Sequence, residues 1–220
     1  MTKPMQSVEA LFFDFDGVLV DSTHTKKKAF ETLFKDFSDE IIKAVVHYHV
    51  LHGGISRVVK IRHAHENIIK EPLTEKEVME WAGRYSDLVV QDVVRAPWIK
   101  GAKGFLDAYA SKLPVFMVSG TPEPELKYIV DQRKIGHYFK EILGSPVKKT
   151  EHIRRLLEKH SLTAKQCVFI GDALTDYNAA LETGLRFIGI QGEVNFPDTV
   201  KPLPDCQGLE STIKKMCPAF

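Results

Sequence analysis

The stretch ALFFDFDGVLVDS, residues 10–22, begins like a buried β-strand and then places two carboxylates close together. The apolar run at residues 10–13 is typical of a parallel strand that is covered on both faces. Asp14 and Asp16 follow with only Phe15 between them, at or just beyond the carboxyl end of the strand. An aspartate in this position often only closes a turn. The rest of the chain must decide between that interpretation and a pair of carboxylates that hold a metal and perform chemistry.

The composition describes a globular chain with almost balanced charge. Its 220 residues suit one large domain, or one domain with an insertion, and 44% of them are hydrophobic. The 30 basic and 29 acidic residues leave a net charge of +1, which gives no bulk signal for nucleic acid or an anionic membrane. No apolar run approaches the roughly 20 residues of a membrane-spanning helix. We therefore expect a soluble protein with no nucleic-acid or membrane partner.

The cysteines and the first residues favour a cytoplasmic location. The three cysteines are an odd number without zinc-type spacing, and MTKPMQSVEA, residues 1–10, lacks the apolar core of a secretory signal. A reducing compartment fits both observations best.

Short apolar runs alternate with helical patterns along the chain. Five runs, LFFDFD, PVFMVSG, EILGS, CVFIGDA and RFIGI, are each typical of a parallel strand. Strands that alternate with helices predict a doubly wound parallel α/β sheet, in which ligands bind beyond the carboxyl ends of the strands. Several polar residues end these runs, and we expect them to converge on one crevice: Asp14, Asp16, Ser119, Ser145 and Asp172.

The alternation is interrupted after the first strand. The next ninety residues or so have patterns that predict only helices. This segment is longer than a single crossover between parallel strands needs. One of these helices is preceded by Thr74 and Glu77 in a capping-box pattern. We therefore predict an α/β core at residues 1–19 and 96–220, with an α-helical cap inserted at residues 20–95.

Four motifs in order give the chain a resemblance to a known family. They are DFDGVLVDS, VSGTP, GSPVKKTE and GDALTDYNAA, and each falls at the end of a predicted strand or just after it. In this order and context the chain resembles the haloacid dehalogenase (HAD) superfamily, in the branch that contains phosphoglycolate phosphatase and β-phosphoglucomutase. The resemblance covers nearly the whole chain.

The resemblance implies a magnesium-dependent phosphatase. Asp14 would be the nucleophile that forms an aspartyl-phosphate, and Asp16 would be the general acid and base. Halide-displacing relatives lack an acid at the second position, so Asp16 favours phosphate chemistry. Mg²⁺ would be held by Asp14, by the backbone carbonyl of Asp16 and by Asp172. Asp176, one helical turn after Asp172, would support the site from behind these ligands.

The second and third motifs imply a binding site for the transferred phosphoryl group. Ser119 and Gly120 precede Pro122, which we expect to be the first residue of a helix whose N–H groups face the anion. The phosphate-binding lysine is Lys149 by the local spacing, and Lys148 is the alternative because adjacent residues of an extended segment cannot both point inward. A lone serine that caps a helix and a pair of solvated lysines remain the alternative interpretations.

Within the cap, the run GGISRVVKIRH favours a substrate-binding role for Arg57. Two glycines before a helix permit close backbone approach, and a guanidinium can bind a carboxylate or a second phosphate in bidentate fashion. A solvated Arg57 is the alternative. The histidines in HYHVLH and HAH do not favour a metal site, because only His49 and His52 have the i, i+3 spacing of a shared helical face.

Other functions share some of these motifs. A β-phosphoglucomutase-like mutase would carry a histidine ten residues after the second aspartate, where this chain has Lys26. A phosphonoacetaldehyde hydrolase needs a cap lysine for a Schiff base, and the comparable position holds Arg57. An inactive binding relative would have lost a charged motif residue, and none is lost. The sequence leaves open which small phosphorylated substrate is used and whether the chain is a monomer or a homodimer.

Overall fold

A central parallel sheet organises the computed structural model, which describes residues 7–217. Residues 1–6, on which part of the secretory-signal prediction depends, lie outside the described residues. Within the described range five strands pair in parallel in the order β3-β2-β1-β4-β5. The strands are β1 (Ala10–Phe13), β2 (Val115–Pro122), β3 (Glu141–Ser145), β4 (Cys167–Gly171) and β5 (Arg186–Gly189).

Alternating side chains of β1 face two separate hydrophobic layers. Leu11 and Phe13 pack in one layer, with residues of α5 (Ala102–Tyr109), α6 (Glu123–Gln132) and α9 (Leu209–Met216). Ala10 and Phe12 pack in the other layer, with residues of α7 (Lys149–Lys159) and α8 (Leu174–Thr183). Burial on both faces explains the continuous apolar run at this strand. The predicted doubly wound α/β sheet is confirmed.

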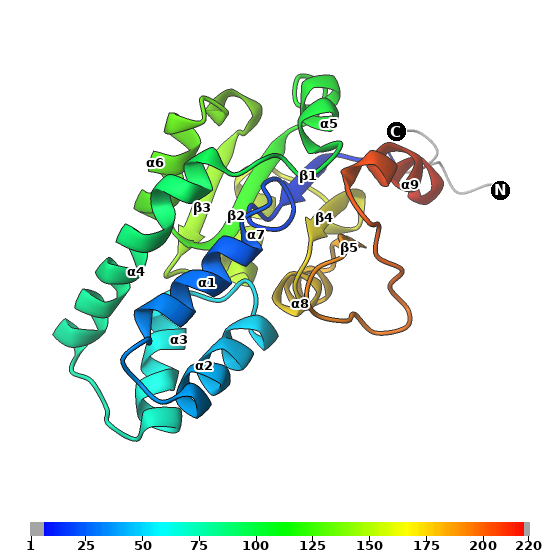
Figure 1. Cartoon of the computed structure of the whole chain (residues 1–220). Helices are drawn as coiled ribbons and strands as arrows, with labels where there is room; N and C mark the ends of the chain where they lie inside the picture. Colours follow the sequence, from blue (N-terminus) through cyan, green and yellow to red (C-terminus); the bar gives the residue numbers. More distant parts are fainter. Residues whose placement is uncertain (1–6, 218–220) are drawn as a thin grey trace.

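The first four of the five α-helices between β1 and β2 lie in the segment that the sequence predicts to be inserted. Figure 1 shows α1, α2 and α3 grouped together beside the sheet, with the long α4 running from this group past α6. A π-helical segment, Ala64–Ile69, extends α3. The helices are α1 (Thr23–Leu33), α2 (Asp39–Leu51), α3 (Arg57–His63) and α4 (Glu75–Arg95). The division into a core and a cap at residues 20 and 95 stays a prediction.

The local signals in this helical segment act as expected. The Thr74 hydroxyl accepts a hydrogen bond from the Glu77 amide, and the Glu77 carboxylate accepts one from the Thr74 amide, so the capping box is confirmed. Phe30 and Leu33 on α1 are buried, and Phe30 lies against Tyr85 of α4 with ring centroids 4.6 Å apart. The helices therefore have a small aromatic core of their own.

Two further features bear on the composition-based expectations. No helix within residues 7–217 is long and apolar enough to cross a membrane. Cys167, Cys206 and Cys217 are buried and form no disulfide.

Candidate active site

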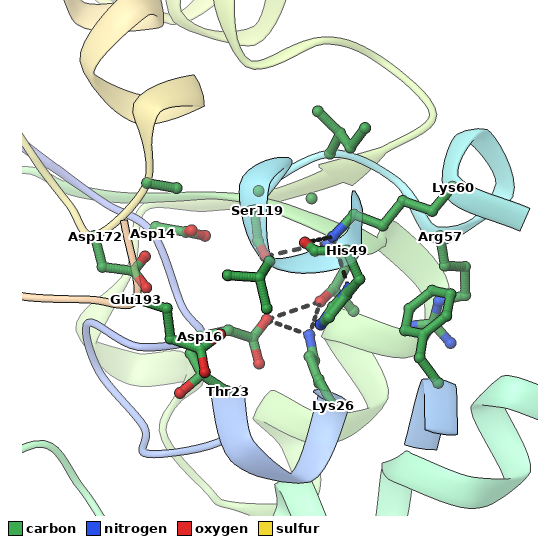
Figure 2. Close-up of a pocket in the computed structure, with 18 of the residues that line it drawn as sticks. Asp14, Asp16, Thr23, Lys26, His49, Arg57, Lys60, Ser119, Asp172 and Glu193 are labelled. Carbon is green, nitrogen blue, oxygen red and sulfur yellow. Dashed lines mark hydrogen bonds and ion pairs between the residues drawn. The ribbon is translucent and has the colours of Figure 1, made fainter. Parts of the chain in front are cut away.

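The carboxyl ends of β1, β2 and β4 meet at one cavity of about 100 Å³, closed from the other side by α1, α2 and α3. Four of the predicted strand-end residues line it: Asp14, Asp16, Ser119 and Asp172. Figure 2 shows Asp14 and Asp172 on one side of this pocket and Lys60 and Arg57 reaching in from the other. Ser145 lies instead in an adjoining groove of about 410 Å³, which Ser119 and Lys149 also line.

Lys149 connects two buried carboxylates at the base of the site. Its ammonium lies 2.9 Å from Asp14 Oδ2 and 2.5 Å from Asp176 Oδ1. Burial alone would lower the pKa of Lys149, but the carboxylates of Asp14 and Asp176 outweigh it and raise the pKa above the ordinary value. Lys148 is exposed and precedes the first residue of α7, whereas Lys149 is buried. The structure thus places Lys149 in the site and Lys148 outside it.

Three carboxylates gather where a cation would be required. One oxygen from each of Asp14, Asp172 and Asp176 lies within 4.8 Å of the others. Burial, followed by the carboxylates of Asp14 and Asp176, raises the pKa of Asp172 well above its ordinary value. Asp176 already binds Lys149 through Oδ1 and the Ala173 amide through Oδ2. The three carboxylates therefore form a donor set that fits a hard divalent cation.

The loop after β1 can approach Asp172 only because residue 17 is glycine. Gly17 has a φ of +76°, and a Cβ at this position would lie 2.1 Å from Asp172 Oδ2. A side chain there would be strained and would also displace the Asp172 carboxylate.

Three donors hold the Asp16 carboxylate, and the sequence analysis assigned none of them to the site. Its carboxylate accepts hydrogen bonds from Ser22 Oγ at 2.6 Å and Thr121 Oγ1 at 3.0 Å, and it forms an ion pair with Lys26. Burial favours the neutral acid, but the Lys26 ammonium and these donors lower the pKa of Asp16 below its ordinary value. Lys26 also donates to Thr121 Oγ1 at 2.9 Å. The sequence signal that could have identified Lys26 as a partner of Asp16 is its position ten residues after Asp16.

The segment after β2 differs from the prediction in one respect. The expectation that Pro122 begins a helix is wrong, because Pro122 is the N-cap residue and α6 begins at Glu123. Ser119 Oγ accepts a hydrogen bond from the Thr121 amide at 3.2 Å and is buried. Gly120 lies against the loop between α2 and α3, and a Cβ there would be 2.2 Å from the Gly54 carbonyl oxygen. Ser119 thus lies at the strand end, while Gly120 permits close contact between the two halves of the site.

The structure places the Arg57 guanidinium against a carboxylate of the same chain. Arg57 lies at the start of α3 and forms a bidentate ion pair with Glu125 of α6, with Nη1 to Oε2 at 2.8 Å. Nη1 also donates to Ser86 Oγ at 2.7 Å, and the guanidinium carbon lies 4.7 Å from the Tyr85 ring centroid. Both side chains of the pair are nearly buried. Arg57 was expected to bind the substrate, but here Glu125 occupies its bidentate face.

This ion pair predicts a structural effect for Arg57. We expect Arg57→Ala to lower the free energy of unfolding by about 3 kcal/mol, because Glu125 is left as a buried charge without its partner. Activity toward p-nitrophenyl phosphate and toward a carboxylate-bearing phosphate ester should fall by similar factors, because the contact holds α3 against α6. Thermal denaturation and parallel steady-state assays test both statements.

The matched control for Arg57 is the double variant Arg57→Met with Glu125→Met. Since it removes both charges and keeps apolar volume, it should recover most of the lost stability. A loss of activity confined to the carboxylate-bearing ester would contradict the structural role and return Arg57 to substrate binding.

Comparisons with known proteins agree with the fold and the site. A family model described as haloacid dehalogenase-like hydrolase matches residues 11–190. The chain belongs to the haloacid dehalogenase-like hydrolases and is an enzyme.

Individual relatives cover most of the chain. A phosphoglycolate phosphatase of Aliivibrio fischeri is 24% identical over 211 residues, which cover 92% of this chain and 91% of the relative. A solved structure from Haemophilus somnus, described as a predicted phosphoglycolate phosphatase, has a TM-score of 0.75 at 21% identity and covers 96% of this chain and 100% of its own. CbbY from Rhodobacter sphaeroides, solved in complex with phosphate, has a TM-score of 0.69 at 16% identity, with coverage of 91% and 96%. These solved structures share the fold of this chain.

Proposed function

We propose that this hydrolase is a magnesium-dependent phosphatase that acts on a small phosphorylated metabolite through an aspartyl-phosphate on Asp14. The observation that carries the proposal is the cluster in which Asp14 meets the buried ammonium of Lys149 and the carboxylate of Asp172. Phosphoryl transfer needs a nucleophile, positive charge on the transferred oxygens and a proton for the leaving oxygen. The residues around the cavity offer each of these.

Asp14 is the proposed nucleophile, and its neighbours orient it. Asp14 Oδ1 accepts a hydrogen bond from the Phe15 amide at 2.7 Å, which fixes the rotation of the carboxylate. A carboxylate oxygen attacks phosphorus and the ester oxygen leaves, so that an acyl phosphate forms on Asp14. Lys149 and the Ser119 hydroxyl are placed to hold the phosphoryl oxygens as charge redistributes. Water then attacks phosphorus, and Asp14 is released as a free carboxylate.

Asp16 is the proposed general acid and base. The ionised form favoured by Lys26, Ser22 and Thr121 is the form that takes a proton from the attacking water in the second half of the reaction. In the first half the leaving alkoxide needs a proton. A phosphoryl dianion beside Asp16 raises the pKa of this carboxyl, because like charge disfavours ionisation.

Asp14 and Asp172, together with the backbone carbonyl of Asp16, are the proposed ligands of Mg²⁺. When bound, this cation would offset the repulsion between the Asp14 carboxylate and the phosphate dianion. Lys149 would keep Asp176 away from the cation, because the ammonium binds the Asp176 carboxylate directly.

The size of the cavity supports a short substrate. Its volume of about 100 Å³ is well below the ~300–1,000 Å³ of pockets that hold drug-sized ligands. A phosphoryl group with two or three carbon atoms fits this space, and a larger substrate would have to extend into the adjoining groove of about 410 Å³ that Ser119 and Lys149 also line. The phosphoglycolate phosphatases among the relatives make 2-phosphoglycolate the first substrate to test.

The function is tested with a panel of phosphorylated metabolites assayed with Mg²⁺ and again with EDTA. We expect phosphate release in the presence of Mg²⁺, highest for two- and three-carbon esters, and loss of activity by at least about 100-fold on metal removal. Restoration by added Mg²⁺ separates loss of the ion from unfolding. Full activity in EDTA, or a preference for hexose phosphates, would contradict the proposal.

A further inference from the structure

Lys60 is a buried lysine in the wall of the active-site cavity. It lies on α3, three residues after Arg57, so both side chains start from the same face of the helix. Only 5% of its surface is exposed, and it lines the same cavity as Asp14 and Asp172. Figure 2 shows its side chain running from α3 toward the middle of the pocket, where its ammonium nitrogen lies beside His49.

The other cations of the site each have a carboxylate partner. Lys26 is paired with Asp16, Arg57 with Glu125, and Lys149 with both Asp14 and Asp176. Lys60 has no such partner in the described part of the chain. Within residues 7–217 its ammonium forms hydrogen bonds with His49, to the ring Nδ1 at 2.9 Å and to the backbone oxygen at 3.1 Å.

His49 positions this ammonium without neutralising it. Burial, and then the nearby charge of Lys60, lowers the pKa of His49 to about 2, so the imidazole is neutral and Nδ1 accepts the hydrogen bond. The His49 ring is itself held against Phe30, with ring centroids 4.5 Å apart. An ammonium has three N–H donors, and the two contacts with His49 leave one for a ligand.

The surroundings of Lys60 within the protein disfavour its positive charge. Burial, followed by the ammonium of Lys26, lowers the pKa of Lys60 to about 7. Each element that packs around Lys60 contributes a charged or titratable group. These groups are Lys26 on α1, His49 on α2, Arg57 on α3, Tyr85 on α4, and Asp16 and Asp172 after the strands. An anion that enters the cavity would favour the charged form.

We propose that Lys60 selects the substrate by binding a carboxylate that lies one or two carbon atoms from the phosphoryl group. This proposal rests on the phosphatase function proposed above and names the substrate class of that same site. The reacting phosphoryl group lies with Asp14 and Lys149, and the carboxylate lies against Lys60 at the cap side of the cavity. Lys60 and Asp14 line the same cavity of about 100 Å³, so the two ends of one short ligand can reach both side chains.

The test compares 2-phosphoglycolate with ethyl phosphate, which has a methyl group in place of the carboxylate. Binding of both esters to Asp14→Asn protein is measured by calorimetry in Mg²⁺, so that the ligand is not consumed. We expect 2-phosphoglycolate to bind about 10- to 100-fold more tightly, as for a hydrogen bond between charged groups. Adding Lys60→Met should bring the ratio of the two dissociation constants close to one. Lys60→Arg should retain part of the preference for 2-phosphoglycolate, since the guanidinium keeps the positive charge but differs from the ammonium in shape.

The same pair of esters gives a kinetic version of the test. In otherwise wild-type protein, Lys60→Met should lower the ratio of kcat/KM for 2-phosphoglycolate over ethyl phosphate by about 10- to 100-fold. The matched control is Lys43→Met, on the exposed face of α2, which should leave this ratio unchanged.

Stability distinguishes substrate binding from a structural role. Since the folded chain disfavours the Lys60 charge, Lys60→Met should unfold at pH 6 at a temperature no lower than that of the wild type. A lower melting temperature with equal losses on both esters would overturn the proposal in favour of a structural lysine. An unchanged ratio of dissociation constants would overturn it directly. Failure of the wild-type chain to hydrolyse any ester would instead overturn the phosphatase function, and the binding ratio would still decide the role of Lys60.

Discussion

Asp14→Asn is expected to abolish phosphatase turnover while the protein stays folded. An amide cannot attack phosphorus to form the acyl phosphate, so kcat should fall on the order of 10⁴-fold or more. The substitution removes one of three clustered carboxylates and leaves Lys149 its second partner, Asp176. The melting temperature should therefore change little, by an amount equivalent to about 1 kcal/mol or less. Steady-state assays and thermal denaturation measure the two effects.

A direct readout of the covalent intermediate completes this test. Wild-type protein quenched in acid during turnover should carry a phosphoryl group on the peptide that contains Asp14, as detected by mass spectrometry. Asp198→Asn, at an exposed position far along the chain, is the matched control and should behave like the wild type. Turnover near the wild-type rate in folded Asp14→Asn protein would refute the mechanism.

Lys149→Met is expected to damage both activity and stability. The ammonium lies between Asp14 and Asp176, and its removal leaves two buried carboxylates without their cation. We expect a stability loss of about 3–5 kcal/mol in metal-free protein, the usual cost of removing one partner from a buried ion pair. We also expect kcat/KM to fall on the order of 10³-fold, because the phosphoryl oxygens lose a charged donor.

The adjacent lysine supplies the control for this variant. Lys148→Met changes an exposed side chain of the same type one residue away, and it should alter stability by less than about 0.5 kcal/mol. Chemical denaturation in EDTA and assays in Mg²⁺ test the pair of variants together. Equal effects of the two substitutions on kcat/KM would show that the burial of Lys149 has no bearing on phosphate binding.

The ion pair between Lys26 and Asp16 affects how the proposed acid works. The pair favours the ionised form of Asp16, and Thr121 contacts both side chains. A mutase-like relative would place a histidine where this chain has Lys26. An ammonium in this place would favour the base half of the proposed reaction, in which water would hydrolyse the aspartyl-phosphate.

The order of strands and helices could be predicted from the sequence because its signals are local. A parallel strand that is covered on both faces needs a continuous apolar run, and the run at residues 10–13 shows this pattern directly. The convergence of Asp14, Ser119 and Asp172 follows from the same pattern, since the carboxyl ends of adjacent parallel strands meet at one edge. The boundary at Pro122 was wrong by one residue because cap geometry is not set by residue type alone.

The pairing of charges was decided by tertiary structure. Arg57 meets Glu125 across 68 residues of sequence, and Lys60 meets His49 across a helix connection. A lysine or arginine looks the same in the sequence whether its charge is neutralised or left free, because the partner is set by how distant elements pack. The sequence by itself determined that the carboxylates of the candidate site, Asp14, Asp16 and Asp172, lie at the ends of the strands. Only the packing of α1–α4 against the sheet and its helices decided that the Arg57 guanidinium pairs with Glu125 and that the Lys60 side chain lines the cavity.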